Sequence, residues 1–246
     1  CLALIPFLGP VGANFPRLLL MSVVGASLQY SLTFTGVSNL GAGLSALVVQ
    51  LEVPFLVLLG AVLLDERPGL RKWIGIIIAF CGVGIIASQE SFSGSILPIL
   101  LVVGGAFTWA FGQVLVRGIR DMSGLSITAW TAVLAAPQLF ILSALVETGQ
   151  IAALATAGPQ DWSAAIYLGL VMTALGYFLW NSLLLRQEVN RVAPYLLLLP
   201  VFSVIGGIIF LGEQLTLFRL AGGGVVLSGV ALITIEFSNP KVASSE

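Results

Sequence analysis

A single carboxylate stands in the middle of a long apolar run of this sequence. Glu52 lies within LVVQLEVPFLVLLGAVLL, residues 47–64, where Gln50 is the only other polar side chain. A charge at the centre of an apolar helix costs about 2.5–3.5 kcal/mol on insertion scales, so such a residue generally faces a cavity or a partner. Pro54 can leave a backbone carbonyl free to line that cavity. We predict that Gln50 and Glu52 bind a substrate and that Glu52 carries the coupling proton. The alternative is a Glu52 that only joins helices.

Two further groups combine aromatic surface with a side-chain amide. Trp109 and Gln113 stand four residues apart, and Tyr177, Trp180 and Asn181 follow at spacings of three and four. These spacings place each group on one face of a helix. Such a face suits a small zwitterionic or aromatic amino acid, so we predict that both groups line a substrate site. The alternative is packing between helices, with hydrogen bonds worth about 0.6 kcal/mol each.

The sequence lacks the residue sets that enzymes and cofactor sites need. It contains no His, and Cys1 and Cys81 are its only cysteines. No span holds two carboxylates that could act as acid and base, and no Walker motif for ATP is present. A net charge of −1 without a basic tract does not suit nucleic acid. We therefore expect no enzyme, no cofactor, no metal site and no nucleic-acid partner, and an ion or substrate gradient as the energy source.

Composition indicates the solvent in which these residues work. Of the 246 residues 58% are hydrophobic and 9% are charged, whereas a soluble domain carries about 25% charged residues. Helices are the open-chain structures that span lipid, and each needs roughly 20 apolar residues. We predict an all-α integral membrane protein, with Ser38 or Asn39 capping its second helix. The eight predicted spans are 18–37, 40–64, 71–88, 95–116, 124–146, 163–185, 192–212 and 218–237.

The basic residues predict an orientation. When the segment before residue 18 is placed in the cytoplasm, nine of the ten Lys and Arg residues fall inside and Arg219 alone falls outside. Lys and Arg collect on the cytoplasmic side of bacterial-type membrane proteins. We therefore expect a multi-pass protein of the bacterial plasma (inner) membrane, with residues 239–246 as a cytoplasmic tail.

The chain also matches itself at an offset of 147 residues. Tyr30 aligns with Tyr177, and the other matched pairs are Gly60/Gly207, Glu66/Glu213, Gly75/Gly222 and Gly82/Gly229. Glu66 falls inside and Glu213 outside, so the two copies have opposite orientations, as in secondary transporters. We add Tyr30 to the predicted substrate site. Gln50 and Glu52 align with Leu197 and Leu199, which suggests a task that only one copy performs.

Three longer stretches carry a family resemblance over residues 18–236. AGLSALVVQLEVPFLVLLGAVLLDER, GAFTWAFGQVLVRGI and LGYFLWNSLLLRQEVNRVAPYLLLLPV resemble the EamA-domain permeases of the drug/metabolite transporter superfamily, in particular exporters of cysteine and O-acetylserine. The resemblance implies ten helices in two inverted five-helix halves around a central cavity. We then expect residues 1–89 to be the first repeat, lacking its first helix and most of its second, and 95–238 to be the second repeat. The start CLALIPFLGP has no initiator Met, and we expect a fragment with eight of ten helices.

These observations converge on a function. We predict a secondary-active exporter of small amino acids or related metabolites, which works by alternating access and is coupled to protons. Its partners would be a small-molecule substrate and membrane lipid. A homodimer is also consistent with the sequence. One alternative is a drug or lipophilic-cation exporter, in which Glu52 is the counter-ion of the cation. Another is a membrane scaffold or lipid-handling module without a solute pathway.

Overall fold

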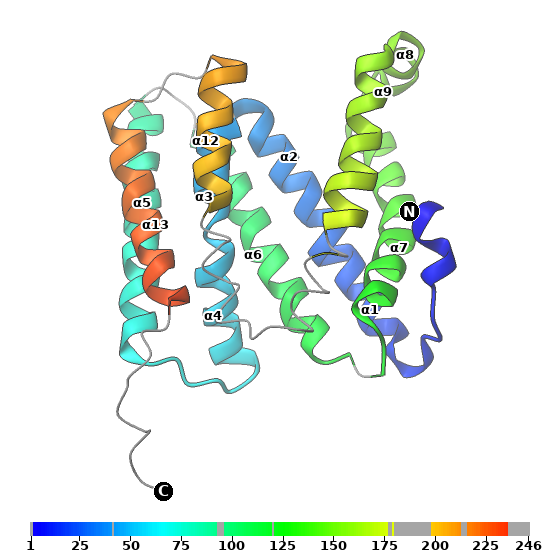
Figure 1. The fold of residues 1–246 in the computed structure, drawn as a ribbon, viewed down its shortest axis with the longest axis horizontal. Coiled ribbons are helices and arrows are strands. Elements are labelled where there is room, and N and C mark those ends of the chain that lie inside the picture. Colours follow the sequence, from blue (N-terminus) through cyan, green and yellow to red (C-terminus); the bar gives the residue numbers. More distant parts are fainter. Residues whose placement is uncertain are drawn as a thin grey trace, which may run out of the picture.

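Every regular element in the described part of the chain is a helix (Figure 1). The computed structural model describes residues 2–40, 42–92, 96–119, 121–176, 179, 198–212 and 216–235. Six helices within these ranges are long and apolar enough to cross a membrane, namely Gly12–Leu40, Ala42–Leu63, Leu70–Ser88, Leu97–Val116, Gly124–Val146 and Leu217–Thr234. The predicted spans 163–185 and 192–212 fall partly outside the described residues. The described part of 192–212 contains α12 (Leu198–Leu211), an apolar helix shorter than the six spans. The chain is therefore an all-helical, multi-pass membrane protein.

Two of the six spans are not continuous α-helices. The first consists of η2 (Gly12–Asn14), α1 (Phe15–Ser22), the π-helical segment η3 (Val23–Leu28) and α2 (Gln29–Leu40). The second is divided into α3 (Ala42–Val49) and α4 (Glu52–Leu63). Irregular backbone in a membrane helix is tolerated where it is buried in protein or lines a cavity. These two interruptions therefore mark regions to inspect for function.

The remaining elements of the described residues are also helical. They are η1 (Leu2–Phe7), α5 (Leu70–Phe92), α6 (Leu97–Arg117), α7 (Gly124–Val146), α8 (Gln150–Thr156), α9 (Pro159–Ile166), the π-helical segment η4 (Tyr167–Leu175) and α13 (Leu217–Thr234).

Capping differs from our expectation at the end of α2. The Ser38 hydroxyl and the Asn39 amide both donate to the carbonyl of Thr35, at 2.9 and 3.0 Å. Both residues thus lie inside α2, which continues to Leu40, and the predicted cap at Ser38 or Asn39 is wrong. Elsewhere Ser123 caps α7 by accepting from the Ser126 amide at 3.1 Å, since a hydroxyl oxygen at this position satisfies an otherwise unpaired amide.

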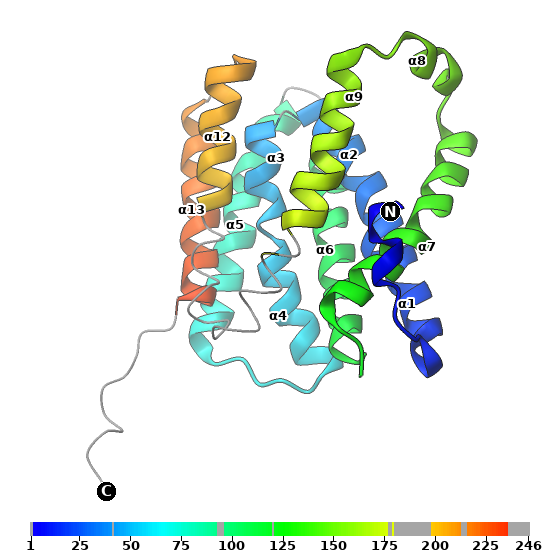
Figure 2. The ribbon, with the colours of Figure 1, turned by 45° about the vertical axis from the view of Figure 1, so that its right-hand side comes forward.

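Helix α3 lies at the centre of the buried core. Leu44, Val48 and Leu51 are almost completely buried and belong to one cluster with residues of α5, α6 and α13. Figure 2 shows α3 between α5 and α6, with α12 on its outer side. The interrupted helix that carries Gln50 and Glu52 is thereby packed against α5, α6 and α13, and this packing fixes the position of its break.

Helices α5 and α13 approach each other backbone to backbone. A Cβ atom added to Gly82 would lie 2.6 Å from the amide nitrogen of Val226, and one added to Gly229 would lie 2.6 Å from the carbonyl oxygen of Gly75. Such distances leave no room for a side chain, and small residues allow membrane helices to pack this closely. Gly75 meets Gly229 and Gly82 meets Gly222, so the two helices are antiparallel.

Candidate functional site

Glu52 is the first residue of α4, directly after the break in its span. The Leu51 amide donates to the Val48 carbonyl at 3.1 Å, and the Val53 amide donates to the Gln50 carbonyl at 3.2 Å. These bonds span three residues, so the chain tightens before the α-helical pattern resumes. We expected the carbonyl opposite Pro54 to be free, but that carbonyl belongs to Gln50 and accepts from Val53. The expectation is therefore wrong for this carbonyl.

The break lies halfway along the span, next to Glu52, whose position at mid-span the sequence predicted. Glu52 is the eleventh of the 22 residues in the span Ala42–Leu63. One turn further on, Phe55 contacts Phe80 of α5 and Phe107 of α6 edge to face, with ring centroids 5.2 and 5.4 Å apart. Phe107 is itself near the middle of the span Leu97–Val116. Residues of α4 and α6 near Glu52 and Phe107 therefore share one depth.

Tyr30 reaches the same depth from α2. Gly36 packs against Val102 of α6, and Gly105 packs against Thr33 of α2. The two helices run in opposite directions, and extending this register places Tyr30 level with Phe107 and Thr108. Glu52 lies at the same level on the neighbouring α3–α4 junction. Tyr30 also stacks on Phe34, with ring centroids 5.6 Å apart.

Trp109 and Gln113 lie on α6, which contacts α2, α3 and α4. Both residues are partly buried, as are Tyr30, Gln50 and Glu52. These five predicted residues thus stand on three adjoining segments of the bundle, namely α2, the α3–α4 junction and α6. Tyr177, Trp180 and Asn181 lie outside the described residues.

The polar atoms of these five side chains are unsatisfied but reachable. Among the described residues none of the five makes a side-chain hydrogen bond, and none of their polar atoms is fully enclosed. The one enclosed side-chain polar atom without a partner in this part of the structure is the hydroxyl of Ser45. A polar group inside a bilayer either bonds to a neighbouring helix or faces a polar cavity. No neighbouring helix in the described part of the structure bonds to these five side chains.

The polar contacts that join helices are made by other residues, which we did not predict. The Ser27 hydroxyl donates to Oε1 of Gln138 at 2.8 Å, and Nε2 of Gln138 donates to the Ser22 hydroxyl at 2.8 Å. Ser22 and Ser27 are 0% and 5% exposed. Their spacing of five residues does not mark one face of an α-helix, so no periodic pattern could have indicated them.

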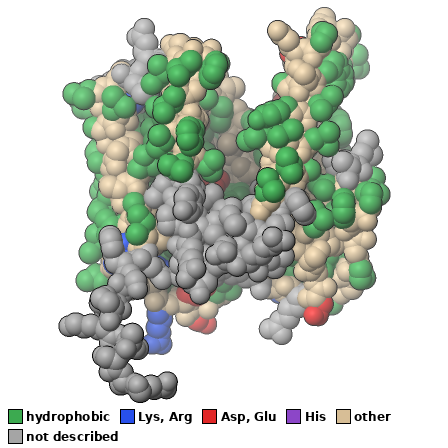
Figure 3. Space-filling model, viewed as in Figure 1, with side chains coloured by type: hydrophobic (Ala, Val, Ile, Leu, Met, Phe, Trp, Pro, Cys, Tyr) green, Lys and Arg blue, Asp and Glu red, His purple; other side chains and the backbone are tan. Residues whose placement is uncertain are grey.

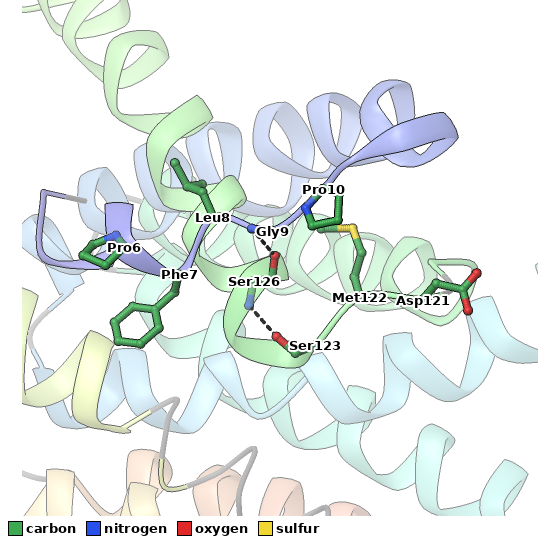
Figure 4. Close-up of a pocket in the computed structure, with 9 residues that line it drawn as sticks. All are labelled: Pro6, Phe7, Leu8, Gly9, Pro10, Asp121, Met122, Ser123 and Ser126. Atoms are coloured by element: carbon green, nitrogen blue, oxygen red, sulfur yellow. Dashed lines mark hydrogen bonds between the residues drawn. The ribbon is translucent and has the colours of Figure 1, made fainter.

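A separate pocket of about 340 Å³ lies where η1 and the following loop meet the start of α7. In Figure 4 the Ser126 hydroxyl accepts a hydrogen bond from the Gly9 amide at 3.0 Å. Trp130 of α7 also donates to the Gly9 carbonyl at 2.9 Å. No residue predicted for the substrate site lines this pocket. It is bounded by Pro6, Phe7, Leu8, Gly9, Pro10, Asp121, Met122, Ser123 and Ser126.

Charge is unevenly distributed over the molecule. In the face shown in Figure 3, apolar side chains cover the helices, and most of the visible acidic and basic side chains lie along the lower edge. The α4–α5 and α6–α7 connections lie at this edge in Figure 1. At the same end Arg17 donates to the Gly118 carbonyl, which places a cation at the negative end of α6.

Comparison with known proteins places this fold in a family. The model of the EamA-like transporter family matches residues 2–88 and 96–235. The "Probable amino-acid metabolite efflux pump" of Salmonella typhimurium is 32% identical over 221 residues, which cover 85% of this chain and 73% of that protein. The protein of the same name from Escherichia coli is 30% identical over 212 residues, covering 82% of this chain and 71% of that protein.

Two further comparisons extend this result. The "Probable terminal-alkyne amino-acid exporter" of Streptantibioticus cattleyicolor is 28% identical over 236 residues, which cover 92% of this chain and 77% of that protein. One solved crystal structure shares the fold with a TM-score of 0.60 at 16% identity, covering 88% of this chain and 75% of that chain. The chain belongs to the EamA-like transporter family and is a membrane transporter rather than an enzyme.

Proposed function

We propose that this protein is a secondary-active exporter of small amino acids or related metabolites, coupled to protons and working by alternating access. The observation that carries this proposal is the set of five polar side chains on α2, the α3–α4 junction and α6, which are unbonded and reachable within the apolar bundle. The names of the relatives add amino acids and their metabolites as the substrate class. Tyr177, Trp180 and Asn181 complete the proposed site from the second half.

Glu52 has the central role in the proposed mechanism. Its carboxylate stands alone at mid-span, where an ammonium group of the substrate would compensate its charge. After the substrate leaves, a proton would replace the ammonium group. The Glu52 carboxyl group would then be either protonated or paired with the substrate throughout the transport cycle. Tyr30, Gln50, Trp109 and Gln113 would supply hydrogen bonds and aromatic surface for the remainder of the solute.

Alternating access requires two halves that can move against each other, and we propose that they are inverted repeats, within residues 1–89 and 95–238. Three features recur at the offset of 147 residues. The π-helical residues 23–28 correspond to residues within η4. Asp65 and Gly212, which follow α4 and α12, both have positive φ values, 54° and 64°. Gly75 of α5 meets Gly229, the counterpart of Gly82, and Gly82 meets Gly222, the counterpart of Gly75.

The same proposal includes an orientation. The end of the molecule with the α4–α5 and α6–α7 connections would face the cytoplasm of a bacterium, together with the tail 239–246, because most basic residues belong to this side. Eight of ten helices would then be present, and a homodimer is compatible with the large lipid-facing surface.

The proposal is tested in proteoliposomes. Uptake of a panel of radiolabelled neutral amino acids under an imposed pH gradient would be compared between the unchanged protein, Glu52→Gln and Glu147→Gln. Glu147 is an exposed carboxylate just after α7 and serves as the matched control. We expect gradient-driven uptake to be lost in Glu52→Gln and kept in Glu147→Gln.

Other results would lead elsewhere. Equal uptake by Glu52→Gln and the unchanged protein would reduce Glu52 to a helix contact. Uptake that lipophilic cations inhibit and amino acids do not would favour the drug-exporter alternative. Absence of solute uptake by the folded protein would leave the scaffold alternative.

A further inference from the structure

The first span contains a π-helical segment that is bonded to α7 at both of its ends. Ser22 immediately precedes η3, and Ser27 is its fifth residue. Both hydroxyls bond to the one side-chain amide of Gln138, each at 2.8 Å, and Ser27 also lies 3.5 Å from the carbonyl oxygen of Ala135. We call Ser22, Ser27 and Gln138 the amide clamp. It lies in the middle third of both spans.

The amide clamp requires the π conformation. At 3.6 residues per turn, side chains five residues apart point about 140° away from each other on an α-helix. In a π turn, whose hydrogen bonds join residues i and i+5, those two side chains stack on one face. One amide of Gln138 can therefore reach both Ser22 and Ser27 while η3 is π-helical, and would lose one of them if η3 became an α-helix.

A π turn also changes which residues of α2 face the site. It holds one residue more than an α turn, so every later side chain is displaced by one position around the helix. With α1 held by its contacts with α7, conversion of η3 to an α-helix would put Gln29 where Tyr30 now stands. In the present arrangement Gln29 is 8% exposed and donates to the Thr33 hydroxyl at 3.3 Å, whereas Tyr30 is partly buried and lies at the depth of Glu52.

We propose that Gln138 is a positioning residue of the substrate site. It holds η3 in the π conformation and so presents Tyr30, rather than Gln29, to Glu52. This inference rests on the proposed function, in which Tyr30 and Glu52 line the site. Gln138 touches no part of that site itself and acts through the rotation of α2.

Thiol accessibility tests this positioning without any need for transport. Gln29→Cys and Tyr30→Cys would be made separately in a background without Cys1 and Cys81. Their reaction rates with a water-soluble maleimide would be measured in membranes. The reaction rate of a thiol follows its exposure, so we expect the cysteine at 30 to react about tenfold faster than that at 29. Gln138→Met removes both bonds at similar size and should invert this order.

The matched control is Thr131→Val. Thr131 is on the same helix and also faces α1. Its hydroxyl donates to the carbonyl of Ile127 in its own helix at 2.8 Å and lies 3.8 Å from the sulfur of Met21 on α1, so this variant removes a polar contact with α1 outside the amide clamp. We expect this variant to keep the order of rates at 29 and 30. An unchanged order in Gln138→Met would overturn the proposal, as would the same inversion in Thr131→Val.

Two substitutions keep the test informative if a variant folds poorly. Val37→Cys and Ser38→Cys, near the C-terminal end of α2, report the same rotation at a distance from the site. In the present arrangement Ser38 is exposed and Val37 is half-buried. Ser27→Ala removes one arm of the amide clamp and should shift the order in the same direction as Gln138→Met. If Gln138→Met inverts the order of rates but the unchanged protein transports no amino acid, the amide clamp is upheld and the proposed function is refuted. If the order is unchanged but the protein transports amino acids, the amide clamp is refuted and the proposed function is upheld.

Discussion

The crossing of α5 and α13 makes a quantitative prediction, because each helix carries both closely packed glycines and one glycine with free space around it. A Cβ atom at Gly229 would lie 2.5 Å from the Ala79 amide nitrogen and 2.6 Å from the Gly75 carbonyl oxygen. A Cβ atom at Gly224, on the same helix, would meet nothing within 4 Å. On α5 the corresponding pair is Gly82, against Val226, and Gly84, which is free.

The expected magnitude follows from two opposing terms. Alanine gains about 1 kcal/mol over glycine in a helix interior, at packed and free positions alike. Overpacking costs typically 1–3 kcal/mol, and here the neighbours are backbone atoms that cannot rotate aside. Gly224→Ala and Gly84→Ala should therefore leave stability unchanged or raise it. Gly229→Ala and Gly82→Ala should be about 1–3 kcal/mol less stable than their controls.

The assay is reversible unfolding of the purified protein in mixed detergent, followed by tryptophan fluorescence. Comparison within each pair cancels the helix propensity of alanine and leaves the packing term. If Gly229→Ala and Gly82→Ala unfold at the same denaturant concentration as their controls, α5 and α13 do not meet through these glycines. The antiparallel register and the argument for inverted repeats would both be refuted.

Three further predictions concern single polar groups. Ser45→Ala should raise the free energy of unfolding by about 1 kcal/mol, because it removes an enclosed hydroxyl that has no partner; the same detergent titration measures it. Trp130→Phe should lower that free energy by about 1 kcal/mol and speed proteolysis near Gly9, since the indole donates to the Gly9 carbonyl. Gln113→Leu should leave stability unchanged and raise the KM for an amino acid by about 2- to 10-fold, because its amide bonds to no described residue. A fall in stability with unchanged KM would make Gln113 a packing residue.

Composition and apolar run lengths predicted the six membrane spans that the described residues contain. The predicted span 124–146 coincides with Gly124–Val146, and 71–88 differs from Leu70–Ser88 by one residue. Run length works because lipid requires about 20 apolar residues for each crossing, whatever lies inside the bundle. The predicted span 40–64 was correct in extent, but its interruption at Gln50 and Leu51 was not predicted.

The internal interruptions could not be read from local sequence. Residues 23–28, VVGASL, have the same small and apolar character as continuous helices elsewhere in the chain. Their π conformation is associated with Gln138, which is 111 residues away from Ser27. Periodicity reports the faces of a regular helix, so it fails where a tertiary contact changes the number of residues in a turn.

The structure divides the polar residues of the bundle into those that bond to one another and those that bond to no described residue, a division that the sequence did not predict. The sequence left Gln113 and Glu52 open to a role in helix packing or in solute binding, and it gave no indication of Ser22 or Ser27. Ser22, Ser27 and Gln138 satisfy one another in the core, as helix contacts in lipid do. Glu52 and Gln113 have no such partner among the described residues, yet they occupy a bundle with a buried core on every side of α3. A polar group left unpaired in lipid is costly, and the solute that we propose for this site would offset that cost at Glu52.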